Sequence, residues 1–168
     1  TINDLERSIE ARCLSLILRQ QPVAGDLRVV SSALKVVTDL ERIGDHASDI
    51  AELVLRIRGE HVYHVVRHIP GMAMAAREMV RNAIDAFITQ DIDAAKSIEK
   101  QDDIVDELFT KVKNDVIDLL KQSADHADQC IDLLMIAKYL ERIGDHAVNV
   151  CEWTEFAKTG ALKNVRIL

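Results

Sequence analysis

At 168 residues, with 48% hydrophobic but only 4% aromatic side chains, the chain can bury a sizeable core of mainly aliphatic residues, and its two prolines and six glycines leave long stretches free to be helical. A net charge of −7 argues against a nucleic-acid-binding surface, which needs a basic patch, and it suits cation binding. Three cysteines without CxxC spacing argue against a disulfide framework.

The first half of the chain predicts two helices. Residues 1–20 carry apolar side chains at spacings of three and four, a pattern typical of one helix face, and the chain begins inside this pattern without a capping residue. A second, unusually long helix is predicted from about 26 to 58, ended by Gly59. The connector that follows, 60–69, contains three histidines that we interpret as part of a polar linker rather than as a metal site: His61, His64 and His68.

Three more helices are predicted in the second half. They cover residues 70–88, roughly 92–121 and about 127–158, and they are joined by short polar corners. The last of them ends near Gly160. No segment alternates with period two, so no strand is predicted.

An internal duplication organises these helices. The segment Leu-Glu-Arg-Ile-Gly-Asp-His-Ala occurs at 40–47 and again at 140–147. Because short loops make neighbouring helices antiparallel, we predict an all-α fold of two tandem three-helix bundles, residues 1–60 and 61–168. The first bundle shows only two helices, so we expect its N-terminal helix to lie upstream of Thr1, in a longer natural protein.

Each copy of the repeat places two carboxylates four residues apart, Glu41 with Asp45 and Glu141 with Asp145. On a helix such residues lie on one face, with Cβ atoms ~5–6 Å apart, and two carboxylates there repel each other unless a cation or solvent separates them. Heptad steps from either glutamate meet mainly apolar residues, which places both glutamates at packing positions. Buried carboxylates are usually paired, protonated or metal-bound.

The second unit supplies further carboxylates. Asp102 and Asp106 are also four apart, and antiparallel pairing of the last two long helices brings them level with Glu141 and Asp145. Four facing carboxylates would make a hard, oxygen-rich site suited to Mg, Mn, Ca or iron.

The matching site of the first unit is expected to be incomplete. Asn3 takes the place of Asp106, and the residue matching Asp102 would lie before Thr1. Asp49, one turn beyond Asp45, could add a ligand there.

Ion pairing is the alternative to metal binding, with Arg42 or Arg142 neutralising a carboxylate on a solvated face. The sequence leaves both interpretations open. His46 and His146 each follow an aspartate and point about 100° away from it on a helix, so a supporting or surface position is favoured over ligation. Gly44 in the middle of a helix, like its counterpart in the second repeat, indicates close helix approach or room for something bound.

The chain resembles the PhoU family of phosphate-uptake regulators. The resemblance rests on the segment Gln-Gln-Pro-Val-Ala-Gly-Asp-Leu-Arg at 20–28, on both copies of the repeat, and on the Asp-x-x-Val-Asp motif at 102–106. It implies two tandem three-helix bundles, often dimeric, whose Glu/Asp-x-x-x-Asp motifs hold multinuclear metal clusters. Position by position, it implies Glu41 and Asp45 for a first cluster, and for a second cluster Asp102, Asp106, Glu141 and Asp145. Iron is the metal expected, with Zn, Mn and Mg as alternatives.

The function that the resemblance implies is regulatory. Such proteins transmit phosphate sufficiency from the phosphate-specific ABC transporter to a membrane sensor histidine kinase and hold the phosphate-starvation response off. The expected partners are this kinase, the transporter's ATPase and a second copy of the chain, with no nucleic acid. We expect a cytoplasmic location, at the inner face of the membrane, because the sequence has no signal peptide and no apolar run of the ~20 residues that a membrane span needs.

Enzyme function is disfavoured by the motifs. The chain has no Glu-x-x-His, no HExxH and no phosphate-cradling glycine-rich loop. A metal-free helical adaptor whose acidic faces dock on basic partners is the first alternative, and a carboxylate-metal enzyme is the second.

Overall fold

The computed structural model describes residues 1–57, 67–162 and 165–166. In this part of the chain the all-α prediction is confirmed, with six helices that end within a few residues of the predicted boundaries, except at one break. The helices are α1 (Ile2–Gln20), α2 (Ala24–Arg56), α3 (Ile69–Thr89), α4 (Ile92–Glu99), α5 (Asp102–Gln122) and α6 (Ala127–Thr159).

The prediction that no strand exists is wrong at the C-terminal end. Strands β1 (Ala161–Leu162) and β2 (Val165–Arg166) pair antiparallel directly after α6. Strands of two residues are too short to give a period-two pattern, so the sequence carries no signal for them.

The ends of the first two helices also refine the predictions. Thr1 caps α1, because its hydroxyl oxygen accepts from the backbone N–H of Asp4 at 3.3 Å while its own hydroxyl donates to the Asp4 carboxylate at 2.6 Å. This capping box contradicts the expectation of an uncapped start. Helix α2 ends at Arg56, and its predicted stop, Gly59, lies outside the described residues, as do two of the connector's histidines, His61 and His64.

The single helix predicted over 92–121 is wrong, because the chain breaks between α4 and α5. The backbone N–H of Gln101 donates to the carbonyl of Ile98 at 2.8 Å, a tight turn, and α5 starts afresh at Asp102. No glycine or proline marks this break. Asp102 and Asp103 occupy the first turn of α5, where the positive end of the helix dipole favours carboxylates.

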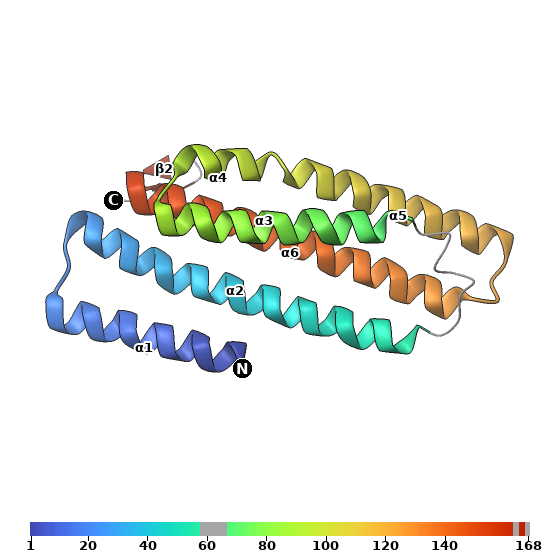
Figure 1. Cartoon of the computed structure of the whole chain (residues 1–168), viewed down its shortest axis with the longest axis horizontal. Helices are drawn as coiled ribbons and strands as arrows, with labels where there is room; N and C mark the ends of the chain where they lie inside the picture. Colours follow the sequence, from blue (N-terminus) through green and yellow to red (C-terminus); the bar gives the residue numbers. More distant parts are fainter. Residues whose placement is uncertain (58–66, 163–164, 167–168) are drawn as a thin grey trace.

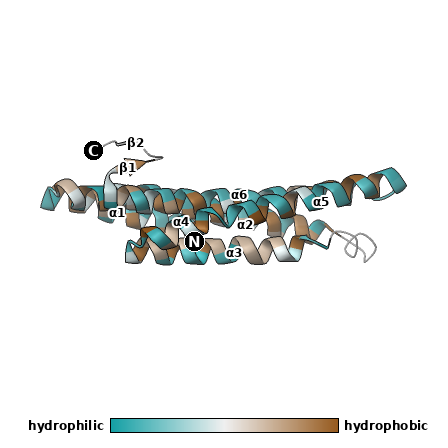
Figure 2. Cartoon of the chain, turned by 90° about the horizontal axis from the view of Figure 1, so that it is seen from above, coloured by the Kyte–Doolittle hydropathy of each residue, from teal (hydrophilic) through white to brown (hydrophobic). Residues whose placement is uncertain are grey.

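Helix α6 is the centre of the architecture. It runs antiparallel beside α2, with α1 on the far side of α2 and α4–α5 on the far side of α6 (Figure 1). Seen from above, these helices lie in one layer and α3 lies in a second layer (Figure 2). Helix α6 contacts α2, α3, α4 and α5, whereas α1 packs on α2 and buries no residue of its own.

The core consists of aliphatic and small side chains between α3, α5 and α6. Helix α3 contributes residues at spacings of three and four, all nearly inaccessible to solvent: Met72, Ala76, Met79 and Ala83. Helix α5 contributes Val105, Val112 and Val116. The same cluster extends to Val36 of α2, so the two predicted bundles meet in an apolar interface. The division at residue 60 stays a prediction.

Candidate functional site

The carboxylates of the second repeat gather where the start of α5 meets the middle of α6. A Cβ atom on Gly144 would lie 2.9 Å from Asp102 Oδ1 and 3.6 Å from Val105 Cγ1. Gly144 therefore permits α5 to approach α6 closely at this point. These contacts confirm the antiparallel register predicted from the sequence.

Asp102 is the most perturbed carboxyl of this group. Its Oδ1 atom is buried and has no hydrogen-bond partner among the residues that the structure describes. Burial raises the pKa of Asp102 to about 6, aided by the negative charges of Asp106, Asp145 and Glu141. Partial burial and the charge of Glu141 also raise the pKa of Asp145, although its side chain reaches the surface. The four predicted ligands thus lie close enough for their negative charges to act on one another.

Lys138 already supplies one positive charge to this group. Its Nζ lies 2.6 Å from Glu141 Oε1 and also contacts Oε2. The same ammonium lies 5.5 Å from the centre of the Phe109 ring on α5, a cation–π distance. Among the described side chains, the ion pair on Glu141 is made by Lys138 and not by Arg142, the residue expected from the sequence. The i,i+3 spacing of Lys138 and Glu141 was the signal that could have identified it.

The first repeat realises the ion-pair alternative more directly. Arg42 Nε lies 3.6 Å from Glu41 Oε2, and Arg42 Nη1 lies 3.6 Å from Asp45 Oδ2. Asp49 lies 3.8 Å from His46 Nδ1, and Asn3 is exposed on α1.

Helix α1 meets α2 in the register that the duplication predicts. A Cβ atom on Gly44 would overlap Ile2 Cδ1, so Ile2 covers Gly44 as Val105 covers Gly144. This matches the placement of Asn3 at the position that corresponds to Asp106. The ligand roles assigned to the first-repeat residues remain predictions.

The two repeat histidines meet each other across the α2–α6 interface. Their rings lie 5.6 Å apart, centre to centre. His146 Nδ1 lies 2.8 Å from Asp39 Oδ1, which also accepts from Asn149 Nδ2 at 3.0 Å, while His46 stacks on Tyr139 with ring centres 5.4 Å apart. The contact between positions 39 and 146 thus has a counterpart between positions 139 and 46. A local twofold axis therefore relates the two repeats at this interface. Sequence reasoning missed this contact, because it depends on how the two repeats pack.

No three His, Cys, Asp or Glu side chains within residues 1–57, 67–162 and 165–166 are already grouped as a metal site requires. The donor chemistry at the second site nevertheless suits a hard cation, since it offers several carboxylates and a buried oxygen that accepts no hydrogen bond from the described part of the chain. Metal binding therefore stays a prediction that the chemistry of these residues fits.

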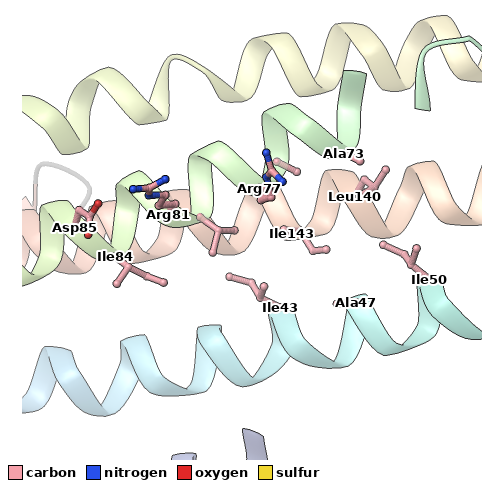
Figure 3. Close-up of a pocket in the computed structure, with 12 residues that line it drawn as sticks. Ile43, Ala47, Ile50, Ala73, Arg77, Arg81, Ile84, Asp85, Leu140 and Ile143 are labelled. Carbon is pink, nitrogen blue, oxygen red and sulfur yellow. The ribbon is translucent and has the colours of Figure 1, made fainter. Parts of the chain in front are cut away.

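A largely apolar groove of about 530 Å³ lies between α2, α3 and α6 (Figure 3). Ile43 and Ile50 of α2 face Leu140 and Ile143 of α6, and the α3 side carries charged side chains, Arg77, Arg81 and Asp85. Ala147 of α6 is fully buried, whereas its counterpart Ala47 in α2 is exposed. The face of α2 that carries Ala47 is thus open to solvent, whereas the corresponding face of α6 is buried.

The two repeat glycines provide a matched test of the site. Alanine favours a helix over glycine by about 1 kcal/mol at either position. In Gly44→Ala, the new methyl meets the Ile2 side chain, which is 48% exposed and can shift toward solvent. In Gly144→Ala, it displaces the Asp102 carboxylate from a packed pocket. We expect Gly144→Ala to be at least about 1 kcal/mol less stable than Gly44→Ala in chemical denaturation, and equal stabilities would contradict this geometry.

None of the described helices combines the length and the apolar character needed to cross a membrane.

Comparisons with known proteins agree on one family. The PhoU domain family matches residues 1–54 and 69–154. The chain is 39% identical over 160 residues to the phosphate-specific transport system accessory protein PhoU homolog of Clostridium acetobutylicum, covering 95% of this chain and 73% of the relative. It is 34% identical over 166 residues to PhoU homolog 1 of Thermotoga maritima, covering 98% of this chain and 71% of the relative.

Solved structures give the same result. PhoU from Pseudomonas aeruginosa superposes with a TM-score of 0.83 at 34% identity, covering 95% of this chain and 77% of that one. The phosphate transport system regulatory protein PhoU from Streptococcus pneumoniae superposes with a TM-score of 0.85 at 29% identity, covering 96% of this chain and 75% of that one.

Proposed function

Because this chain belongs to the PhoU family, we propose that it is a phosphate-signalling regulator that modulates the phosphate-specific ABC transporter and holds the phosphate-starvation response off. The observation that carries this proposal is the family match along both halves of the chain. The relatives are named as accessory or regulatory proteins of phosphate transport, so the proposed role is regulation rather than catalysis.

The proposed partners are the ATPase of the transporter and a membrane sensor histidine kinase, with the protein acting as a homodimer in the cytoplasm at the inner face of the membrane. The name of the Clostridium acetobutylicum relative, an accessory protein of a transport system, supports an association with transport components. The excess of negative charge suits docking on basic partner surfaces.

We further propose that the second repeat binds metal through Asp102, Asp106, Glu141 and Asp145, with iron as the first candidate and Zn, Mn or Mg as alternatives. The strongest support is the buried Asp102 Oδ1, which has no partner within residues 1–57, 67–162 and 165–166, because a desolvated carboxylate oxygen needs a cation or a proton. When bound, a metal would neutralise the repelling carboxylates and tie α5 to α6, a structural or regulatory role. Glu41 and Asp45, with Asp49 and Asn3, would form a weaker first site, since Arg42 already pairs with two of them.

A metal-free adaptor is the second candidate function. The ion pairs of Arg42 and Lys138 favour it, because they neutralise carboxylates without any metal. In that case the carboxylates would serve helix packing and partner recognition alone.

One experiment tests both parts of the proposal. In cells that lack their own PhoU-family protein, the protein that carries this chain should lower transcription from a phosphate-starvation promoter when phosphate is plentiful. The same protein, purified without chelator or affinity tag, should contain stoichiometric metal by elemental analysis, and Asp102→Ala combined with Glu141→Ala should remove it.

The two readouts separate the possible outcomes. Repression without metal in either protein would favour the adaptor, and an unchanged promoter would contradict the regulatory role. Stoichiometric metal retained by the double variant would contradict the ligand assignment. Helix content measured by circular dichroism should be the same in both proteins, which excludes unfolding as the cause of metal loss.

A further inference from the structure

The ammonium of Lys138 contacts the Glu141 oxygens to which a metal would have to bind. It contacts both oxygens of that carboxylate, which is only 15% exposed. A carboxylate whose two oxygens both accept from an ammonium group has little capacity left for a metal ion.

The position of the ammonium is fixed from two sides. Lys138 is on α6, three residues before Glu141, and its Nζ also lies over the ring of Phe109 on α5. Contacts on both α5 and α6 therefore hold this ammonium beside one ligand of the proposed metal site.

The first repeat lacks this arrangement. The residue at the corresponding position is Thr38, whose hydroxyl donates to the carbonyl of Leu34 at 3.2 Å. Its carboxylates are paired instead with Arg42, a residue common to both repeats. Lys138 is thus a feature of the second repeat alone, placed beside the fuller set of carboxylates.

We propose that Lys138 is a tethered competitor for the metal, a built-in cation that occupies Glu141 when no metal is bound and must leave when a divalent cation binds. This inference rests on the metal site proposed above. The lysine would set the metal affinity of the second repeat, keep the carboxylates partly neutralised in the empty state, and limit binding to conditions in which the metal is plentiful.

The test compares two substitutions at position 138, with Mn²⁺ as the probe and calorimetric titration as the measurement. Lys138→Met keeps the length and packing of the side chain but removes the charge, whereas Lys138→Arg keeps the charge. We expect Lys138→Met to bind Mn²⁺ roughly tenfold or more tightly than the unsubstituted protein, the scale of one charge-assisted hydrogen-bonded pair. Lys138→Arg should bind like the unsubstituted protein.

A second readout follows the ammonium itself. Acetylation of Lys138 by acetic anhydride, measured by mass spectrometry, should accelerate several-fold when Mn²⁺ saturates the protein. Lys121 is the matched control, because it also pairs with a carboxylate three residues away, Asp118 at 3.0 Å, but lies near the far end of α5. Its acetylation rate should not respond to Mn²⁺.

The outcomes distinguish this inference from the metal site on which it rests. Equal or weaker Mn²⁺ binding by Lys138→Met, or an unchanged acetylation rate at Lys138, overturns the competitor role while the metal site stands. Mn²⁺ binding by Lys138→Met alone supports the inference. If neither protein binds Mn²⁺, both the metal site and the competitor are overturned.

Discussion

Replacing Met79 with alanine should lower the free energy of unfolding by about 2–5 kcal/mol, the cost of truncating a fully buried methionine. Met79 is 1% exposed and lies on α3, facing α6. Its Cε would be 3.9 Å from a Cβ on Gly144, so it packs directly beneath the point where Asp102 approaches α6. Denaturation in urea, followed by helix circular dichroism, measures the loss.

Met74 on the same helix provides the control. It is 64% exposed, so Met74→Ala removes the same atoms without leaving a cavity and should change the unfolding free energy by less than about 0.5 kcal/mol. Similar losses in the two variants would contradict the burial of the α3–α6 interface. A large difference would show that packing between α3 and α6 contributes strongly to stability. The same packing supports the part of α6 that Asp102 approaches.

The sequence predicted most of the helices because their signals are local. Apolar spacing and the breakers between segments depend only on neighbouring residues, and α2, α3 and α6 begin and end within about two residues of their expected positions. The short corner between the last two long helices added a constraint that is not local. Since antiparallel helices joined by a short corner have a fixed register, the amino-acid pattern alone places Asp102 level with Asp145 and Asp106 level with Glu141. The charge of Asp145 does act on Asp102.

What the sequence did not reveal depends on packing between elements. The break before Asp102 has no glycine or proline, so helix propensity alone could not place it. The contact of His46 with His146 requires the two repeats to meet face to face, which neither repeat specifies by itself. The choice of Lys138 over Arg142 as partner of Glu141 depends on side-chain conformation and on the aromatic ring that α5 brings beside it.

The pH dependence of stability should show that the ionised carboxylate of Asp102 destabilises the folded state. Burial and neighbouring carboxylates raise its pKa from the ordinary value of 3.8 to about 6. The folded protein therefore binds this proton more tightly than the unfolded chain does, and this contribution to the unfolding free energy falls as pH rises from about 4 to above 6. Asp102→Asn cannot lose that proton. In chelator, we expect it to become more stable than the unsubstituted protein over this window, by about 1 kcal/mol after allowing for solvent screening of the partly exposed group.

Asp103→Asn separates this effect from the helix dipole. Asp103 occupies the same first turn of α5 but is exposed, so both substitutions remove a carboxylate from the positive end of the helix. Only Asp102→Asn should become more stable relative to the unsubstituted protein as pH rises from about 4 to above 6. Parallel pH profiles for the two variants would contradict the unfavourable burial assigned to the Asp102 carboxylate. Saturating Mn²⁺ should reverse the order of stability, because a metal bound only by the folded state stabilises the protein that retains the Asp102 carboxylate. A metal bound at the proposed site would thus link the stability of the α5–α6 pair to metal supply.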